Sequence, residues 1–67
     1  MQRVEPSELE EGDRFSQERS SEKFEVVGFA QISGYPAVIG ENVETGQRHR
    51  FGGMPAYSPT LFKLEDA

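Results

Sequence analysis

The stretch Ala37-Val-Ile-Gly-Glu-Asn-Val-Glu-Thr-Gly-Gln-Arg-His-Arg-Phe51 decides the fold of this chain. Residues typical of strands stand on both sides of Glu44-Thr45-Gly46, so the stretch predicts a β-hairpin closed by a three-residue loop. Gly46 is predicted to take a positive φ, because it lacks the Cβ atom that penalises this conformation. We expect the rest of the chain to wrap around this hairpin.

The second arm of the hairpin places side chains alternately on its two faces. Arg48 and Arg50 share one face, and His49 and Phe51 share the other. Phe51 is predicted to face the core, which leaves the two arginines in solvent. The predicted core comprises apolar residues from the whole chain: Phe15, Phe24, Val26, Ile39, Phe51 and Leu64.

The longest strand candidate is the segment 23–32. Its apolar side chains occupy both parities, which a strand with one solvated face does not show. A bulge or sharp bend at Gly28 would switch the phase and explain both sets. Before it, residues 13–15 begin a shorter strand, and residues 16–22 are polar without periodicity and predict a mobile loop.

The N-terminal part contains a capping-box pattern. Ser7 is followed three residues later by Glu10, and Gly12 is placed to end the helical turn that Ser7 begins. Only one helical turn fits between them, and Leu9 within it is predicted to close one end of the core. The turn directly precedes the strand that begins at residues 13–15.

Two connections follow the long strand candidates. Residues 33–36 contain glycine and proline and predict a turn. Residues 52–57 form a longer connection, in which Gly52-Gly53 lacks the lysine and the strand-to-helix context of a phosphate-binding loop. Ser58-Pro59 resembles an N-cap followed by proline at the first helical position, so a single 3₁₀ turn is predicted there.

The last strand is predicted over residues 61–65. We prefer the parity with Phe62 and Leu64 inward, because the opposite parity, with Leu61 and Lys63 inward, would bury a lysine. The sequence thus predicts an all-β domain of five short antiparallel strands with one or two single helical turns.

The composition limits the class of protein. The 67 residues suffice for one small domain spanning residues 1–67, with residues 66–67 frayed and residues 1–6 frayed or forming a short edge strand. Without cysteine and with one histidine, the sequence predicts no disulfide, no metal site and no cofactor. No apolar run approaches the ~20 residues that span a bilayer, and the N-terminus lacks an apolar signal region, so we expect a cytoplasmic protein without membrane contact.

The order of elements resembles that of SH3-like small β-barrels over about residues 8–65. The resemblance lies in a Leu9-Glu-Glu-Gly-Asp-Arg-Phe15 opening, a polar loop, a long bent strand, a hairpin with Thr45-Gly46 at its tip and the Ser58-Pro59-Thr60 turn before the final strand. It implies a five-stranded antiparallel barrel. Such barrels bind peptides, RNA, DNA or neighbouring subunits, so the resemblance implies no single activity. Peptide-binding SH3 domains grip proline-rich ligands with a tryptophan and several tyrosines, whereas this chain has no tryptophan and two tyrosines.

The charges are unevenly distributed along the chain. The net charge is −5, and residues 1–25 carry eight acids against four bases. Residues 44–63 carry Arg48, Arg50 and Lys63 against Glu44 alone, a local surplus of +2. A net acidic chain is atypical of general nucleic-acid binders, which usually have an excess of lysine and arginine.

The candidate binding residues are Arg48, Arg50, Tyr35, Tyr57 and Lys63. Arginines flanked by tyrosines can contact phosphates while the aromatic rings stack on bases. The alternative is that both arginines are solvated and pair with nearby acids such as Glu41. His49 has no nucleophile motif beside it, and we interpret it as a strand histidine near the barrel rim.

Two hypotheses for the function follow, and neither is an enzyme. The first is an interaction module that docks on another protein through a barrel edge or the hairpin face, with its acidic N-terminal part meeting a basic partner. The second is a module that binds single-stranded RNA or DNA through the face with Arg48 and Arg50. Paired carboxylates at Glu10-Glu11 and Glu65-Asp66 are interpreted as solvated surface.

Overall fold

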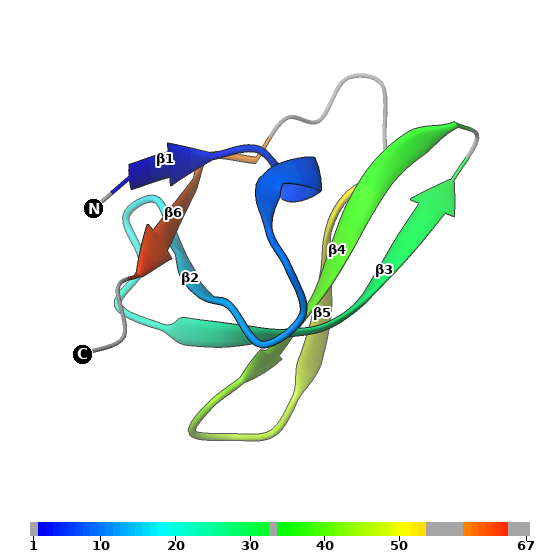
Figure 1. Ribbon diagram of the computed structural model, residues 1–67. Helices are drawn as coiled ribbons and strands as arrows, with labels where there is room; N and C mark the ends of the chain where they lie inside the picture. Colours follow the sequence, from blue (N-terminus) through cyan, green and yellow to red (C-terminus); the bar gives the residue numbers. More distant parts are fainter. Residues whose placement is uncertain (1, 33, 54–58, 65–67) are drawn as a thin grey trace.

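The protein forms an antiparallel β-sheet with one short 3₁₀ turn (Figure 1). The computed structural model describes residues 2–32, 34–53 and 59–64. The strands are β1 (Gln2–Val4), β2 (Arg14–Gln17), β3 (Lys23–Ile32), β4 (Tyr35–Asn42), β5 (Arg48–Gly52) and β6 (Leu61–Leu64), and the 3₁₀ turn η1 covers Pro6–Glu8. The six strands lie in the order β1-β6-β2-β3-β4-β5. The all-β prediction is confirmed.

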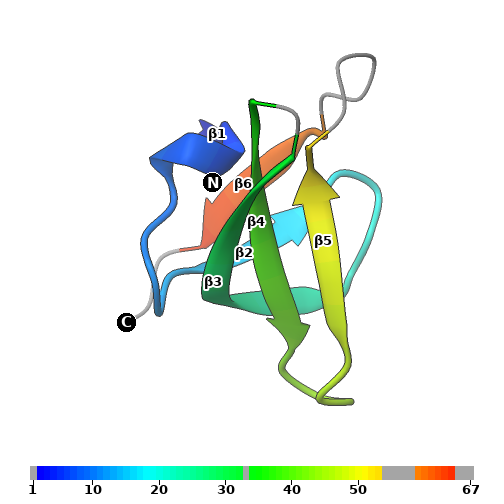
Figure 2. The ribbon, with the colours of Figure 1, turned by 90° about the vertical axis from the view of Figure 1, so that its right-hand side faces the viewer.

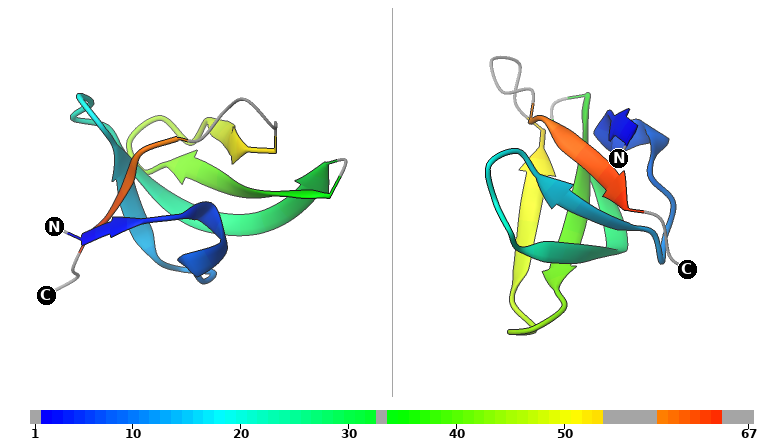
Figure 3. Two further views of the ribbon diagram at one scale, coloured as in Figure 1. Left: turned by 90° about the horizontal axis from the view of Figure 1, so that it is seen from above. Right: turned by 90° about the vertical axis from the view of Figure 1, so that its left-hand side faces the viewer.

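The predicted strand count of five is wrong, and the sheet is not a closed barrel. The additional strand is β1, which pairs with β6 through registers such as Val4 opposite Leu61. Residues 2–4 are therefore a short edge strand, the second of the two alternatives for the N-terminus. The outermost strands of the described sheet are β1 and β5, and these two are not paired with each other. The sheet is strongly bent, so that β2 and β6 lie across from β4 and β5 (Figure 3).

A bulge in β3 produces the switch of phase that the sequence predicts. The pairing of β3 with β4 shifts between Val26 and Gly28, so Val27 is the additional residue. Phe24 and Val26 are buried before the bulge, while the residues after it follow the opposite parity. The bulge allows the strand to take part in both halves of the bent sheet.

The central hairpin is confirmed, but its loop is one residue longer than predicted. Gly46 has a φ of +78°, as expected for the last loop residue. The N–H of Asn42 donates to the carbonyl of Gln47 at 2.7 Å, so the loop comprises the four residues 43–46. The additional residue, Val43, donates its N–H to the carbonyl of Lys23 at 3.0 Å on the neighbouring strand.

The buried amide of Asn42 explains the longer loop. Its Oδ1 accepts hydrogen bonds from the N–H of Glu44 at 2.9 Å and of Thr45 at 3.1 Å, an Asx turn that fixes the start of the loop. Its Nδ2 donates to Oε2 of Glu22 at 3.2 Å. Only 7% of Asn42 is exposed, and this bonding satisfies a polar group that would otherwise be costly to bury.

The loop length changes which residue of β4 enters the core. Adding one residue to the loop shifts the register by one, so Val38 rather than Ile39 lies opposite Phe51. Val38 is fully buried and Ile39 is half-buried. The prediction of Ile39 as a core residue is therefore wrong, whereas that of Phe51 is confirmed.

The parity predicted for the last strand is also wrong. Leu61 is fully buried and lies opposite Val4, whereas Phe62 and Leu64 are half-buried. The parity with Leu61 and Lys63 inward does not bury the lysine, because the side chain of Lys63 remains 42% exposed near the end of β6. Its Nζ reaches the carboxylate of Asp13 at 3.5 Å, so no unpaired lysine is buried.

The core is one cluster with three phenylalanines at its centre. It contains Val4, Leu9, Phe15, Phe24, Val26, Val38, Phe51 and Leu61. The ring of Phe15 lies 5.7 Å from that of Phe24 and 5.2 Å from that of Phe51, and the rings of Phe24 and Phe51 are 5.0 Å apart. Each phenylalanine comes from a different strand, so the cluster joins β2, β3 and β5. The predicted core positions Phe15, Phe24 and Val26 are confirmed.

The N-terminal turn begins two residues earlier than predicted. The N–H of Glu5 donates to Oε1 of Glu8 at 2.7 Å, so the capping pattern uses this pair rather than Ser7 and Glu10. Leu9 is buried, as predicted. The predicted loop 16–22 is shorter, because its first two residues belong to β2. The Ser58-Pro59 turn falls partly outside the described residues.

Gly40 on β4 allows the phenylalanine cluster to close. A Cβ atom at this position would lie 2.6 Å from Cζ of Phe15, a distance that side chains do not tolerate. Replacing Gly40 by Ala should therefore destabilise the fold by about 1–3 kcal/mol through overpacking. Gly28→Ala is the matched control, because a Cβ atom there meets nothing within 4 Å. Equal denaturant midpoints for the two variants would contradict this arrangement of the core.

Asn42 provides a second test of the fold. Removing its amide in Asn42→Ala leaves the N–H groups of Glu44 and Thr45 without their acceptor. We expect a loss of about 1–2 kcal/mol in the free energy of unfolding, measured by urea denaturation. The control is Glu44→Ala in the same loop, which keeps the backbone bonds and should change stability by less than about 0.5 kcal/mol. Similar losses in both variants would mean that the Asx turn does not set the loop.

Candidate functional site

The exposed face of the hairpin brings together three of the predicted binding residues. Arg50 lies opposite Ile39, and Arg48 lies opposite Glu41. Tyr35 shares the parity of these two β4 residues, so it lies on the same face of the sheet as both arginines. Both arginines are exposed, and 42% of Tyr35 is accessible. We call this surface, comprising Tyr35, Ile39, Glu41, Arg48 and Arg50, the arginine face.

A row of charges crosses four strands beside this surface. Arg14, Glu25, Glu41 and Arg48 lie in successive register on β2, β3, β4 and β5. Nε of Arg14 lies 3.5 Å from Oε1 of Glu25. The row therefore has a base at each end and two acids in the middle, and each acid pairs with the base next to it.

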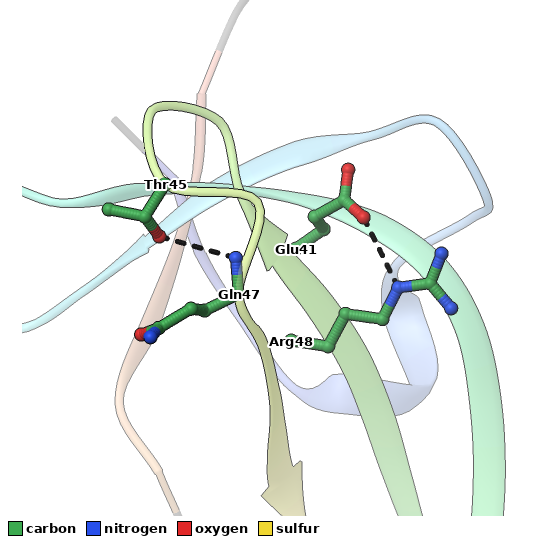
Figure 4. A network of polar contacts seen from close by, with 4 residues as sticks. All are labelled: Glu41, Thr45, Gln47 and Arg48. Atoms are coloured by element: carbon green, nitrogen blue, oxygen red, sulfur yellow. Dashed lines mark hydrogen bonds and ion pairs between the residues drawn. The ribbon is translucent and has the colours of Figure 1, made fainter.

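The guanidinium of Arg48 is paired within its own face. Its Nε donates to Oε1 of Glu41 at 3.2 Å (Figure 4). This is the partner that the solvated alternative predicts for the arginines. The side chains remain 66% and 38% exposed, so the pair is screened by solvent and adds little stability. Its main effect is to offset the charge of Arg48.

The remaining predicted binding residues are not part of the arginine face. Lys63 lies on β6, which β2, β3 and β4 separate from β5 in the sheet. It pairs with Asp13 instead of extending the basic surface. Tyr57 lies outside the described residues. Of the five predicted binding residues, Tyr35, Arg48 and Arg50 share one face of the sheet, and Tyr35 lies four residues along β4 from Ile39, the partner of Arg50.

His49 lies at the rim of the core. Its ring meets that of Phe24 edge-on at 5.6 Å, and the residue is exposed. This is the position expected of a strand histidine at the edge of the fold. Of the paired carboxylates, Glu10 and Glu11 are exposed, and Glu65-Asp66 lies outside the described residues.

The two glycines after Phe51 have a structural role. Gly52 ends β5 with a φ of +98°, and a Cβ atom there would lie 2.8 Å from the carbonyl oxygen of Pro36. Gly53 has a φ of +87° and donates its N–H to the same carbonyl at 3.1 Å. Both are buried, so the start of the predicted connection 52–57 is held against β4.

Among residues 2–32, 34–53 and 59–64, no group of three or more histidine, cysteine or acidic side chains is arranged to hold a metal ion. In the same part of the chain, no helix has the length and apolar character needed to cross a membrane.

The chain has no match among protein-family models, curated proteins or solved structures. Its function is therefore inferred from the geometry and charges of its own residues. The sequence predicts that both arginines lie on the exposed face of the hairpin, because side chains alternate along a strand, and it offers Glu41 as a partner for them. It missed the row through Arg14 and Glu25, since this depends on the register between strands. The opposite charges at these positions are a signal that becomes visible only once the register is known.

The arginine face is expected to contribute little to folding. Replacing both Arg48 and Arg50 by Ala removes one solvent-screened ion pair and no buried contact. We expect the free energy of unfolding to change by less than about 1 kcal/mol in denaturant titrations. A loss comparable to that of a core truncation would show that the arginines are structural and would exclude the double variant as a probe of binding.

Proposed function

We propose that this protein is a small non-enzymatic interaction module that docks on a partner protein, and that its bent sheet is a variant of the SH3-like barrel. The order of elements supports the second part. A turn ending at Gly12 precedes β2, the long β3 is bent by a bulge, a hairpin with Gly46 at its tip follows, and β6 returns beside β2. In this variant β1 extends the sheet beyond β6, and the sheet stays open.

The Arg48–Glu41 ion pair is the observation that most favours docking on protein. A phosphate group approaching Arg48 would have to compete with a carboxylate already 3.2 Å from Nε. The chain's net charge of −5 adds long-range repulsion of a polyanion. Protein interfaces are enriched in arginine and tyrosine, and both residue types are exposed on this face. The fold thus presents a charged but not uniformly basic surface.

Binding of single-stranded RNA or DNA is the second candidate. It is supported by the shared face of Tyr35, Arg48 and Arg50, which carries one exposed aromatic ring and two guanidinium groups. Arg50 makes no ion pair with any described residue, so one guanidinium remains available on this surface.

A salt titration separates the two candidates. If both arginines contact phosphates, the affinity for single-stranded oligonucleotides should fall with salt at a slope of about −0.7 per contact. The double variant Arg48→Ala, Arg50→Ala should then flatten that slope by roughly one to two units. We expect instead no binding of either nucleic acid even at low ionic strength. Steep, arginine-dependent binding would overturn the docking proposal in favour of the second candidate.

Docking itself is tested by affinity capture from the native host after nuclease treatment. The wild-type protein should retain a partner protein that the folded double variant loses. Arg3→Ala is the matched control, because it removes an exposed arginine from β1 at the opposite edge of the sheet and leaves the arginine face unchanged. Retention of the same proteins by all three forms would mean that docking does not use the arginine face.

A further inference from the structure

The outer side of β5 is a free strand edge of the described sheet. β5 has five residues and one neighbour in the sheet, β4, whereas the opposite edge is the three-residue β1. Figure 2 shows β5 beside β4 at the margin of the sheet. An edge strand carries unpaired N–H and C=O groups that can pair with another extended segment. Arg48, His49 and Arg50 on this edge are all exposed.

The ladder between β4 and β5 determines which backbone groups are free. At one end the N–H of Asn42 donates to the carbonyl of Gln47 at 2.7 Å, and at the other the N–H of Gly53 donates to the carbonyl of Pro36 at 3.1 Å. Hydrogen-bonded and non-hydrogen-bonded pairs alternate along an antiparallel ladder. The bonded positions on this arm are therefore every second residue from Gln47 to Gly53.

Because of this alternation, successive residues of β5 direct their backbone groups to opposite sides of the strand. His49 and Phe51 direct their N–H and C=O groups toward β4. Arg48 and Arg50 lie in the non-bonded pairs, so they direct their N–H and C=O groups outward to the open edge. Three residues of β5 lie in non-bonded pairs, Arg48, Arg50 and Gly52, and the two that are exposed carry cationic side chains.

We propose that an extended, acidic segment of a partner protein adds to β5 as a further strand of the sheet. This inference rests on the proposed docking function and specifies its surface and the chemistry of its partner. The outward N–H and C=O groups of Arg48 and Arg50 pair with the backbone of the added strand. One acidic side chain lies opposite Arg50, whose guanidinium makes no ion pair with a described residue, and a second competes with Glu41 for Arg48. A short segment with a few carboxylates meets less long-range repulsion from the net charge of −5 than a polyanion does. The residue between them faces His49 and the rim formed by Phe24, where an apolar side chain fits.

Charge argues against a second copy of this chain as the occupant. A symmetric antiparallel pairing of two β5 edges would place Arg48 of one copy opposite Arg50 of the other. Like charges directly opposite each other destabilise strand pairing. An acidic strand meets the same edge with opposite charge, which identifies the preferred partner.

The test uses a capped peptide in which glutamate alternates with valine, and the same peptide with glutamine in place of glutamate. Three forms of the full chain are compared: wild type, Arg50→Ala and Arg50→Pro. The Ala variant loses the charge, and the Pro variant loses both the charge and the outward N–H. Because that N–H does not bond to β4, proline is compatible with this edge position. Urea midpoints verify that each variant is folded.

We expect the glutamate peptide to bind wild type more tightly than the glutamine peptide. Arg50→Ala should weaken binding, and Arg50→Pro should weaken it by about a further fivefold, as the loss of one hydrogen bond predicts. Equal affinities of the Ala and Pro variants would indicate attraction by charge alone and would overturn strand addition.

Hydrogen exchange on the wild-type protein makes the test independent of the proline variant. In the free protein the amides of Arg48 and Arg50 should exchange quickly, and those of His49 and Phe51 slowly. Saturation with the glutamate peptide should slow exchange at Arg48 and Arg50. Binding without this protection would overturn the inference even if Arg50→Pro failed to fold.

Glu41 allows a variant that should gain binding. Glu41→Gln releases Arg48 from its ion pair, so the glutamate peptide should bind more tightly than it does to wild type. Glu44→Gln is the matched control, because it removes the same charge from an exposed loop position. The gain should be larger for Glu41→Gln, and equal gains would show that Arg48 does not contact the peptide.

The outcomes separate this inference from the proposed function. If no peptide binds but a partner protein is still captured through the arginine face, strand addition is wrong and docking stands. Sedimentation tests for self-association of the protein. If the protein self-associates and the amides of Arg48 and Arg50 then exchange slowly, the occupant is a second copy and the inference is overturned. If an oligonucleotide displaces the peptide and shows the arginine-dependent salt slope, both proposals are replaced by nucleic-acid binding.

Discussion

The contact between the ring of Phe15 and the backbone of Gly40 is the constraint on which the fold depends. Phe15 lies on β2 and Gly40 on β4, two strands that are not neighbours in the sheet, so their contact holds the two halves of the bent sheet together. Phe24 and Phe51 pack around the same ring from β3 and β5. With no cysteine in a chain of 67 residues, apolar packing of this kind is what stabilises the fold. A glycine at position 40 lets the strands approach closely enough for one ring to fill the space.

Much of this arrangement follows from the sequence alone. The two-residue period of strands places Phe15, Phe24 and Phe51 inside and the two arginines outside, because an aromatic ring gains most from burial. The bulge near Gly28 follows from a conflict of parity within one segment. Gly46 follows from the backbone conformation at the end of the loop. These features are local, so the order of residues is sufficient to predict them.

The errors have a common physical origin in register. The four-residue loop depends on the side chain of Asn42, whose Oδ1 accepts hydrogen bonds from the N–H groups of Glu44 and Thr45. The additional loop residue places Val38 instead of Ile39 in the core. The parity of β6 depends on β1, a strand of three residues with little sequence signal. The arginine face was predicted in part, because Arg48 and Arg50 are close in sequence. Lys63 is near the arginines in sequence, but three strands separate β6 from β5 in the sheet, and nothing local in the sequence shows this.

Register also connects the fold to its proposed use. The loop length that brings Val38 opposite Phe51 also determines that Arg48 and Arg50 turn their backbone groups to the open edge. A loop shorter by one residue would shift the partners of both arginines along β4. The core and the candidate docking edge are therefore set by the same hairpin geometry, through the buried amide of Asn42.

Proton NMR tests most directly whether the ring of Phe15 packs against Gly40. A Cβ atom at Gly40 would lie 2.6 Å from Cζ of Phe15, so the α-proton in that direction must lie against the aromatic ring. The account predicts a nuclear Overhauser effect between this proton and the ring protons of Phe15, with the α-proton chemical shift displaced by the ring current. A Gly40 α-proton with an ordinary strand shift and no Overhauser effect to Phe15 would contradict it.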